Sequence, residues 1–154
     1  PIDKLVLEAV RGREGLMARC AGLLNVHFLD LQPVDRLGEL LGLADVHLLP
    51  QRADAADLVM PSKLTGMLSS GRPVLAGARP ETELGQVVAQ CGRIVPPKDA
   101  TAFAAALQAV AADAPLRRTL GERARRFAEE HVARDAVLAR FERDLLDCIA
   151  LPPR

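Results

Sequence analysis

Aromatic residues and net charge are both nearly absent from this sequence. It contains no Trp and no Tyr, and its aromatic share is only 3%. A core must therefore be built from Leu, Val and Ala, and a chain of 154 residues with 49% apolar content can bury one sizeable domain core. The 20 basic and 20 acidic side chains cancel, so we expect neither nucleic acid nor an anionic membrane surface as a partner. Any specificity must come from a local site.

Long apolar runs and paired cysteines are also missing. No apolar stretch approaches the roughly 18 residues that a membrane span requires, and the amino end shows no signal-peptide pattern. Cys20, Cys91 and Cys148 lie far apart without C-x-x-C spacing, which argues against a disulfide framework and a zinc site. We expect a cytoplasmic protein. Because the chain begins at Pro1 and enters an apolar run almost at once, we also expect a piece of a longer protein.

Short segments of strand character alternate with segments of helical character. The apolar spacing predicts strands at 25–31, 45–50, 72–77 and 92–97, and helices at 13–22, 33–44, 82–91 and from 100 onward behind an N-cap at Asp99. Residues 4–10 fit either type. Strands of four to six residues between helices of about ten predict βαβ units. The expected fold is therefore a Rossmann-like α/β domain with a doubly wound parallel sheet.

The last part of the chain, residues 115–150, shows no strand signal. Leu120, Ala124 and Phe127 recur at helical spacing among many Arg and Glu residues. We expect a helical tail that packs on the sheet or on a neighbouring domain. Its arginines are interleaved with acidic residues, a pattern more typical of a solvated helix face than of a phosphate site.

One stretch, DLVMPSKLTGMLSSGRPVLA at 57–76, carries the candidate site. A strand ends at Pro50 and the next helix is expected to start at Ser62, which leaves a long loop at the carboxyl edge of a parallel sheet, where ligands collect. With Ser62 as N-cap, the amides of 63–65 and the charge of Lys63 would suit a phosphate group. Lys63 is equally compatible with an ordinary wet surface. Gly71 and Pro73 fit a helix end and a strand start.

Four segments together resemble a known family. They are LADVHLLPQ, PSKLTGMLSSGRPVLA, CGRIVPPKDATAFAAAL and RRTLGERARRFAEEHV. In order and spacing they are similar to the C-terminal, nucleotide-sugar-binding domain of two-domain retaining glycosyltransferases of the GT-B fold (family 4-like). The resemblance covers about residues 13–142 and looks closest to the WcaI-like branch of colanic acid and exopolysaccharide biosynthesis. It implies that residues 1–154 form one such domain of a longer hexosyltransferase.

The resemblance also implies where the nucleoside-diphosphate sugar would bind. The phosphates would lie at Met60, Pro61, Ser62 and Lys63, the ribose beside Thr65 and Gly66, and the base near Asp30 and Leu31. Helix N–H dipoles and Lys63 would stabilise the leaving diphosphate, and no metal or other cofactor would be needed. A lipid-linked or saccharide acceptor would bind the missing N-terminal domain, so the piece alone would be inactive. The full-length protein would meet the inner face of the cell membrane only peripherally.

The sequence departs from the family at several positions. The family carries two glutamates separated by seven residues, and the equivalent positions here are Leu58 and Gly66. Asp54 or Asp57 would have to take over, unless both are ordinary polar loop residues. The family's first strand and glycine-rich turn, which supply an Arg and a Lys, have no clear counterpart here. VRGREG at 10–15 resembles a later G-x-G-x-x-R turn of the family only loosely, which leaves Arg13 as a marginal candidate, unless it is a surface residue at a helix start. No residue is identified as catalytic.

Two other classes of function remain open. One is a nucleotide-sugar epimerase of similar two-domain architecture, which would need acid/base carboxylates or histidines in its cleft. The other is a non-catalytic α/β interaction module, such as a receiver-like domain. A receiver would place a phosphate-accepting Asp at the carboxyl end of a strand, whereas Asp45 precedes its strand. His27, His47 and His131 fit packed or surface positions better than ligand positions.

Overall fold

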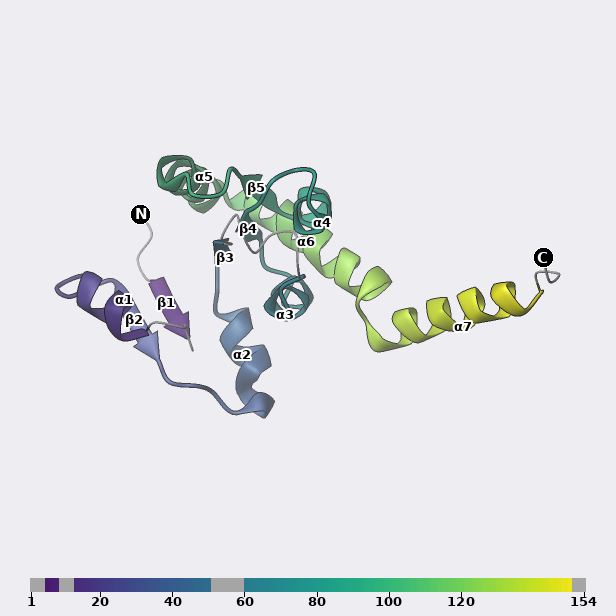
Figure 1. Cartoon of the computed structure of the whole chain (residues 1–154). Coiled ribbons are helices and arrows are strands. Elements are labelled where there is room, and N and C mark those ends of the chain that lie inside the picture. Colours follow the sequence, from purple (N-terminus) through teal and green to yellow (C-terminus); the bar gives the residue numbers. More distant parts are fainter. Residues whose placement is uncertain (1–4, 9–12, 51–59, 151–154) are drawn as a thin grey trace.

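The computed structural model of the protein describes residues 5–8, 13–50 and 60–150, with side chains placed for 13–50 and 60–149. The elements follow one another along the chain as shown in Figure 1. They are β1 (Leu5–Glu8), α1 (Arg13–Arg19), β2 (Val26–Leu29), the 3-10 turn η1 (Val34–Arg36), α2 (Leu37–Gly42), β3 (His47–Pro50), α3 (Lys63–Ser69), β4 (Val74–Gly77), α4 (Glu83–Cys91), β5 (Arg93–Val95), α5 (Ala100–Ala112), α6 (Ala114–His131) and α7 (Arg134–Ala150). The ambiguous segment 4–10 therefore holds a strand.

All strand pairs in the described residues are parallel, but they form two sheets. β1 pairs with β2, and a separate sheet has the order β3-β4-β5. Each pair of neighbouring strands is joined through a helix, as parallel strands require. Because η1 and α2 intervene between β2 and β3 without a ladder joining them, the predicted parallel sheet is present in two parts.

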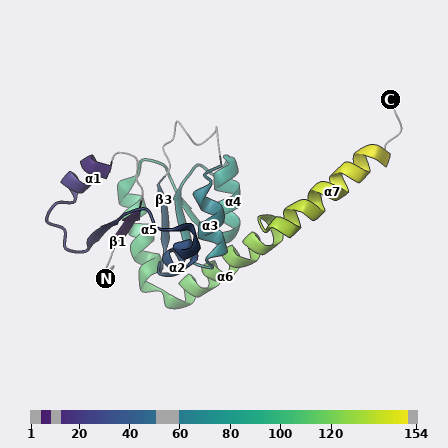
Figure 2. The ribbon, with the colours of Figure 1, turned by 90° about the horizontal axis from the view of Figure 1, so that it is seen from below.

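Helices cover both faces of the central strand β4, whose four residues are all buried. Val74 and Ala76 pack in one cluster with side chains of α3, α4 and α6, including Leu68 and Val88. Leu75, which points the other way along the strand, packs in a second cluster with Ala106 of α5. Figure 2 shows the strands enclosed by these helices. The prediction of a doubly wound α/β fold is confirmed.

Helix ends follow the predicted chemistry in several places. The Asp99 carboxylate accepts a hydrogen bond from the Ala102 amide at 2.8 Å and caps α5 as expected. Gly71 follows α3 with a φ of 69°, the left-handed conformation that glycine adopts at a helix end. A Cβ at Gly121 of α6 would lie only 2.3 Å from the Gly71 carbonyl oxygen, so α6 approaches this turn more closely than a side chain would allow.

The helical tail divides into two helices with different surroundings. α6 packs on α3, α4 and β4 and contributes Leu120, Ala124 and Ala128 to the buried residues. α7 turns away from the end of α6 and projects beyond the domain in both views (Figures 1 and 2). Packing on the sheet is therefore confirmed for α6, while α7 contacts the end of α6 and has no buried side chain among the described residues. Among the described residues, no helix is long and apolar enough to cross a membrane.

Candidate functional site

The three strands of the larger sheet end at one edge, where the site was expected. Pro50 lies opposite Gly77 and Gly77 lies opposite Val95 in the strand register. α3 begins at Lys63 and connects to β4, which is parallel to β3, so its N-terminus lies on the side of this carboxyl edge. Asp54, Asp57 and Leu58 lie outside the described residues. Of the candidate donor-binding residues, those from Met60 to Gly66 can be placed.

Ser62 takes the cap position of α3 without acting as a side-chain cap. Its backbone is helical, with φ −57° and ψ −27°, and its hydroxyl makes no capping hydrogen bond; a capping side chain usually needs an extended backbone. The Thr65 hydroxyl instead donates to the Ser62 carbonyl oxygen at 2.9 Å. The Leu64 amide donates to the Pro61 carbonyl oxygen at 2.9 Å. Of the amides expected to face a phosphate, that of Leu64 is thus already occupied.

Lys63 and Met60 have different surroundings despite being close in sequence. The Lys63 side chain is exposed, and α3 has no acidic residue in its first turn. Its ammonium group therefore adds to the positive end of the helix, and the described first turn of α3 offers no carboxylate to it. Met60 is half-buried and packs against the core cluster of α3, β4 and α4, while Pro61 is half-buried beside it. The apolar contacts of Met60 with this cluster thus hold the chain in place just before α3 begins.

Gly66 of α3 lies close to helix α2. A Cβ at this position would lie 3.1 Å from Cδ1 of Leu41, closer than ordinary van der Waals contact. A larger residue at position 66 would therefore require the Leu41 side chain to shift by a few tenths of an ångström. The close approach of α2 to α3 at this position fits glycine.

Arg13 and Asp30 meet at the carboxyl ends of the smaller sheet. An Nη2 atom of Arg13 lies 3.1 Å from Oδ1 of Asp30, and its Nη1 donates to the Leu29 carbonyl oxygen at 2.8 Å. The carboxylate is almost fully exposed, with 94% of its side-chain surface accessible, so the pair stabilises the fold little, by at most about 1 kcal/mol. Leu31 is exposed next to it. This pairing was not predicted, because it depends on the parallel register of β1 and β2.

A groove of about 620 Å³ lies at the opposite, amino edge of the larger sheet. It was not expected from the sequence. Its lining includes Asp45, Ser70, Arg72, Arg117, Arg118, Glu122, Arg125, Arg126 and Glu129. Three of its arginines donate to carbonyl oxygens where helices end: Arg72 to Gly42, Arg125 to Ser69, and Arg117 to Val110 and Ala111. These arginines hold the carboxyl ends of α2, α3 and α5, which is a structural role.

The histidines do not gather at the carboxyl edge. His47 is buried at the start of β3, where its Nε2 atom lies 3.0 Å from the Ser70 hydroxyl. Burial, and next the Arg72 guanidinium, lower the pKa of His47. His27 and His131 are exposed, so each histidine is packed or on the surface, as predicted. Asp45 lies at the amino edge, where a receiver-type phosphate acceptor would not be. Across residues 13–50 and 60–149, no group of three or more potential ligands could hold a metal ion.

Comparisons with known proteins place the chain among glycosyltransferases. Residues 6–113 match the family described as glycosyl transferases group 1. The "Putative colanic acid biosynthesis glycosyl transferase WcaI" of Escherichia coli K12 is 37% identical over 93% of this chain and 36% of its own length. The chain therefore spans about a third of the length of this curated relative.

Solved structures share the fold at lower identity. Sucrose-phosphate synthase from Thermosynechococcus elongatus is 24% identical with a TM-score of 0.74, over 94% of this chain and 39% of its own. Anabaena HepE in complex with UDP-glucose is 14% identical with a TM-score of 0.72, over 94% and 41%. The C-terminal domain of LpcC from Francisella tularensis is 15% identical with a TM-score of 0.59, over 77% and 60%. The neighbours are GT-B glycosyltransferases, which confirms the predicted half of a GT-B fold.

Proposed function

Since this chain belongs to the family of group 1 glycosyl transferases, we propose that it is the donor-binding domain of a longer glycosyltransferase. The observation that carries the proposal is the order β3, α3, β4 with β3 and β4 parallel, because α3 then begins, with the exposed Lys63, on the side of the carboxyl edge of the sheet. Ligands of open parallel sheets bind at this edge. The complexes of HepE with UDP and UDP-glucose support a nucleotide sugar as the ligand class.

In this proposal the phosphates of a nucleoside-diphosphate sugar lie against the start of α3. When the bond to the anomeric carbon breaks, the diphosphate gains negative charge, and Lys63 together with the helix dipole stabilises that charge more in the transition state than in the ground state. The ribose lies beside Thr65 and Gly66. The base lies towards Asp30 and Leu31, where Arg13 shares its charge between Asp30 and the ligand. Transfer with retention of configuration and without a metal ion is part of the proposal.

The proposed biological role is exopolysaccharide biosynthesis of the colanic acid kind, in the cytoplasm. The name of the WcaI relative supports it. A lipid-linked or saccharide acceptor would bind elsewhere in the longer protein and bring it to the inner face of the membrane. With glycine at position 66, the ribose lacks the family's carboxylate, and we propose Asp54 or Asp57 as its replacement.

The proposal is tested by ligand-observed NMR with UDP, GDP, ADP and their sugar derivatives. We expect one nucleotide to bind selectively and Lys63→Ala to weaken its binding about 10-fold, which corresponds to the loss of one charge-assisted hydrogen bond of about 1.5 kcal/mol. The exposed Lys63 side chain contributes nothing to the core, so the fold should persist. Arg126→Ala is the matched control, because Arg126 is an exposed arginine at the opposite edge.

Equal weakening by both substitutions would indicate nonspecific attraction of an anion and contradict the site. A second expectation is that the 154-residue chain transfers no sugar alone, since the acceptor site belongs to the missing part. Measured sugar transfer by the purified chain would contradict the placement of the acceptor site in another part of the protein.

A further inference from the structure

Helix α6 carries a regular alternation of charge on its exposed side. Arg118, Glu122, Arg126 and Glu130 follow one another at spacings of four residues, and all of them are exposed. Residues four apart on a helix are neighbours on its surface, so the signs read positive, negative, positive, negative along the helix. These residues are called the α6 charge row below.

The charges of the row have almost no partners inside the domain. Among the described residues, Arg118, Glu122 and Arg126 make no hydrogen bond or ion pair. The Oε2 atom of Glu130 lies 3.9 Å from Nε2 of His131, which is longer than a hydrogen bond. Side chains of opposite charge four residues apart could pair along the helix. Because these side chains do not, they are available to a partner.

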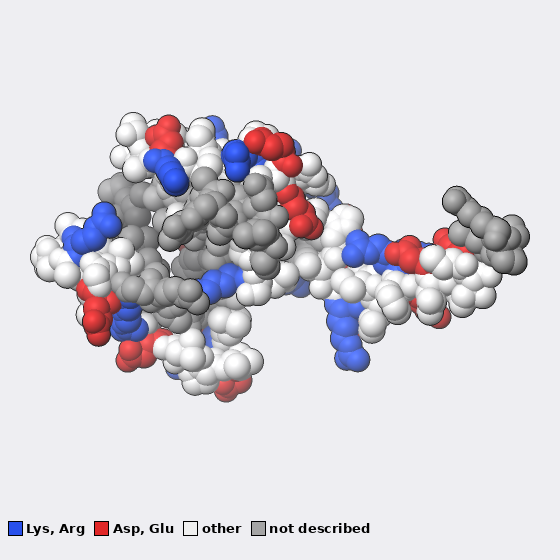
Figure 3. Space-filling view, viewed as in Figure 1, with Lys and Arg blue, Asp and Glu red and all other residues white. Residues whose placement is uncertain are grey.

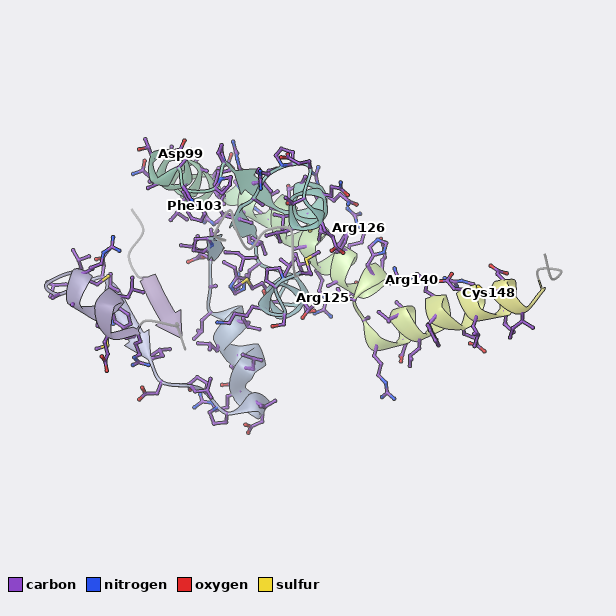
Figure 4. All side chains as sticks on the ribbon, in the orientation of Figure 1. Asp99, Phe103, Arg125, Arg126, Arg140 and Cys148 are labelled. Atoms are coloured by element: carbon purple, nitrogen blue, oxygen red, sulfur yellow. The ribbon has the colours of Figure 1, made fainter. Side chains whose placement is uncertain are left out.

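The row borders the groove at the amino edge of the larger sheet. All of its residues except Glu130 belong to the lining of the groove, and so does Arg125. Arg125 is already occupied, because it donates to the Ser69 carbonyl oxygen and pairs with Glu129, both at 2.6 Å. Figure 4 shows Arg125 on the side of α6 next to α3 and Arg126 away from it. The groove of about 620 Å³ gives the side chains of a partner room beside the row.

The alternation of charge argues against a small anion or a polyanion as the occupant. Arg118 and Arg126 are eight residues apart, about 12 Å along the helix axis, and Glu122 lies between them. A phosphate group held by both arginines would lie beside the Glu122 carboxylate, which repels it. On the face drawn in Figure 3, the described residues also mix the two signs, a distribution that suits neither nucleic acid nor an anionic membrane. The partner that fits must alternate its own charges, as a protein helix can.

A second copy of the chain carries the matching pattern when its α6 runs in the opposite direction. With the two helices centred on Ala124, Arg118 lies opposite Glu130 of the second copy. Glu122 then lies opposite Arg126 of the second copy, and two-fold symmetry repeats both pairs. An antiparallel arrangement shifted by four residues, or a parallel one in register, would place like charges opposite one another. Among closed two-fold arrangements, the row thus favours one register by attraction and by repulsion.

We propose that two copies of the full-length protein associate through their α6 charge rows in this antiparallel arrangement. Exposed ion pairs contribute little each and are screened by salt, so the dimer is weak and salt-sensitive. The groove lies at the amino edge of the sheet, whereas α3 begins on the side of the carboxyl edge. Pairing therefore leaves the candidate donor site open in both copies. The proposal does not depend on which ligand that site binds.

The test is sedimentation velocity of the full-length protein at low salt, over a series of protein concentrations. Arg118→Glu and Glu130→Arg should each raise the dissociation constant of the dimer about 10-fold or more, because each sets like charges opposite one another. The double variant restores opposite charges in reversed order, so its dissociation constant should return to within about threefold of that of the unchanged protein. Salt at about 1 M should dissociate the unchanged dimer.

Arg19→Glu is the matched control for the change of net charge. Arg19 is exposed on α1, which lies apart from α6 in both ribbon views (Figures 1 and 2). The substitution changes the net charge as much as Arg118→Glu does, yet it should leave the dissociation constant of the dimer unchanged. Since Arg19, Arg118 and Glu130 are all exposed, the fold should persist in every variant, and circular dichroism checks the helix content.

Four outcomes would overturn the proposal. A protein that stays monomeric at low salt would exclude a second copy and leave a different protein as the occupant of the row. Association that survives both single reversals would place the contact elsewhere on the molecule. A double variant as weakly associated as the single variants would show that positions 118 and 130 do not face each other. An equal effect of Arg19→Glu would show that net charge, and not the row, controls association.

Discussion

α6 and α7 are consecutive helices of 18 and 17 residues that both carry mixed charges, yet among the described residues α6 has buried side chains and α7 has none. α6 buries Leu120 together with the small residues Gly121, Ala124 and Ala128, which let its backbone approach α3 and β4. α7 presents large side chains such as Phe141, which is 65% exposed. Both helices have an apolar side at helical spacing. The difference shows that the pattern identifies an apolar side of a helix but does not tell whether this domain buries it.

The largest expected contrast compares two leucines. Leu68 of α3, beneath α6, is 1% exposed and Leu145 of α7 is 50% exposed. Leu68→Ala should lower the free energy of unfolding by about 2–5 kcal/mol, because it removes buried methyl groups and leaves a cavity. Leu145→Ala should change it by less than about 0.5 kcal/mol in this chain. Urea unfolding measures both, and similar values would contradict the described difference in packing.

Close approach of α6 gives the next contrast. Gly121→Val should destabilise the chain by about 3 kcal/mol, since the new side chain collides with the Gly71 carbonyl and α6 must shift. Ala139→Val at an exposed position of α7 should change stability by only about 0.5 kcal/mol, through helix propensity. Thermal unfolding of both variants provides the measurement. A stable Gly121→Val variant would mean that α6 is not seated on the turn.

Capping gives a smaller contrast. The Asp113 carboxylate accepts a hydrogen bond from the Leu116 amide at 2.9 Å at the start of α6, so Asp113→Ala should lower stability by about 1 kcal/mol. Asp135 lies in the first turn of α7, and Asp135→Ala removes only its interaction with the helix dipole, about 0.3 kcal/mol. If both substitutions lowered the free energy of unfolding in urea equally, α7 would have to unfold together with the rest of the domain.

The smallest expected effect is the pH dependence of stability that comes from His47, whose side chain contacts Ser70 at the end of α3. Burial, and next the charge of Arg72, lower the pKa of His47 in the folded chain below its ordinary value of 6.5. At a pH between the folded pKa and 6.5, the unfolded chain therefore binds more protons than the folded one. Stability from this group is therefore present above pH 6.5 and is lost as the pH falls through the folded pKa. His47→Gln should reduce the fall in melting temperature between pH 7.5 and 5. The exposed His27 provides a control, and His27→Gln should keep the full decrease.

Much of the fold was predictable because it depends on local chemistry. The alternation of apolar strands and helices gives the α/β class, and Asp99 and Gly71 act at helix ends as their side chains and backbones dictate. The division into two sheets was not predictable, because it depends on how η1 and α2 connect β2 to β3. That α7 does not pack on the sheet was also not predictable, because the sequence pattern indicates an apolar face but not what covers it.

The candidate site shows the same limit. The start of α3 near Ser62 and Lys63 was predictable from the proline and the apolar spacing that follows. The ion pair of Arg13 with Asp30 depends on the parallel register of β1 and β2. The contact between Gly66 and Leu41 joins residues of two separate helices. Tertiary contacts of this kind leave no mark at a fixed spacing in the sequence.

The most direct test of the account is to map nucleotide binding onto the amide signals of this chain by heteronuclear NMR. UDP, GDP and ADP are titrated in turn, and the nucleotide that binds is followed residue by residue. We predict the largest shifts at the start of α3, around Lys63, and at the end of β4, around Gly77, with no change around Arg72 and Gly121 at the opposite edge. Shifts confined to the arginine-lined groove, or none at millimolar concentration, would contradict a donor site at the carboxyl edge.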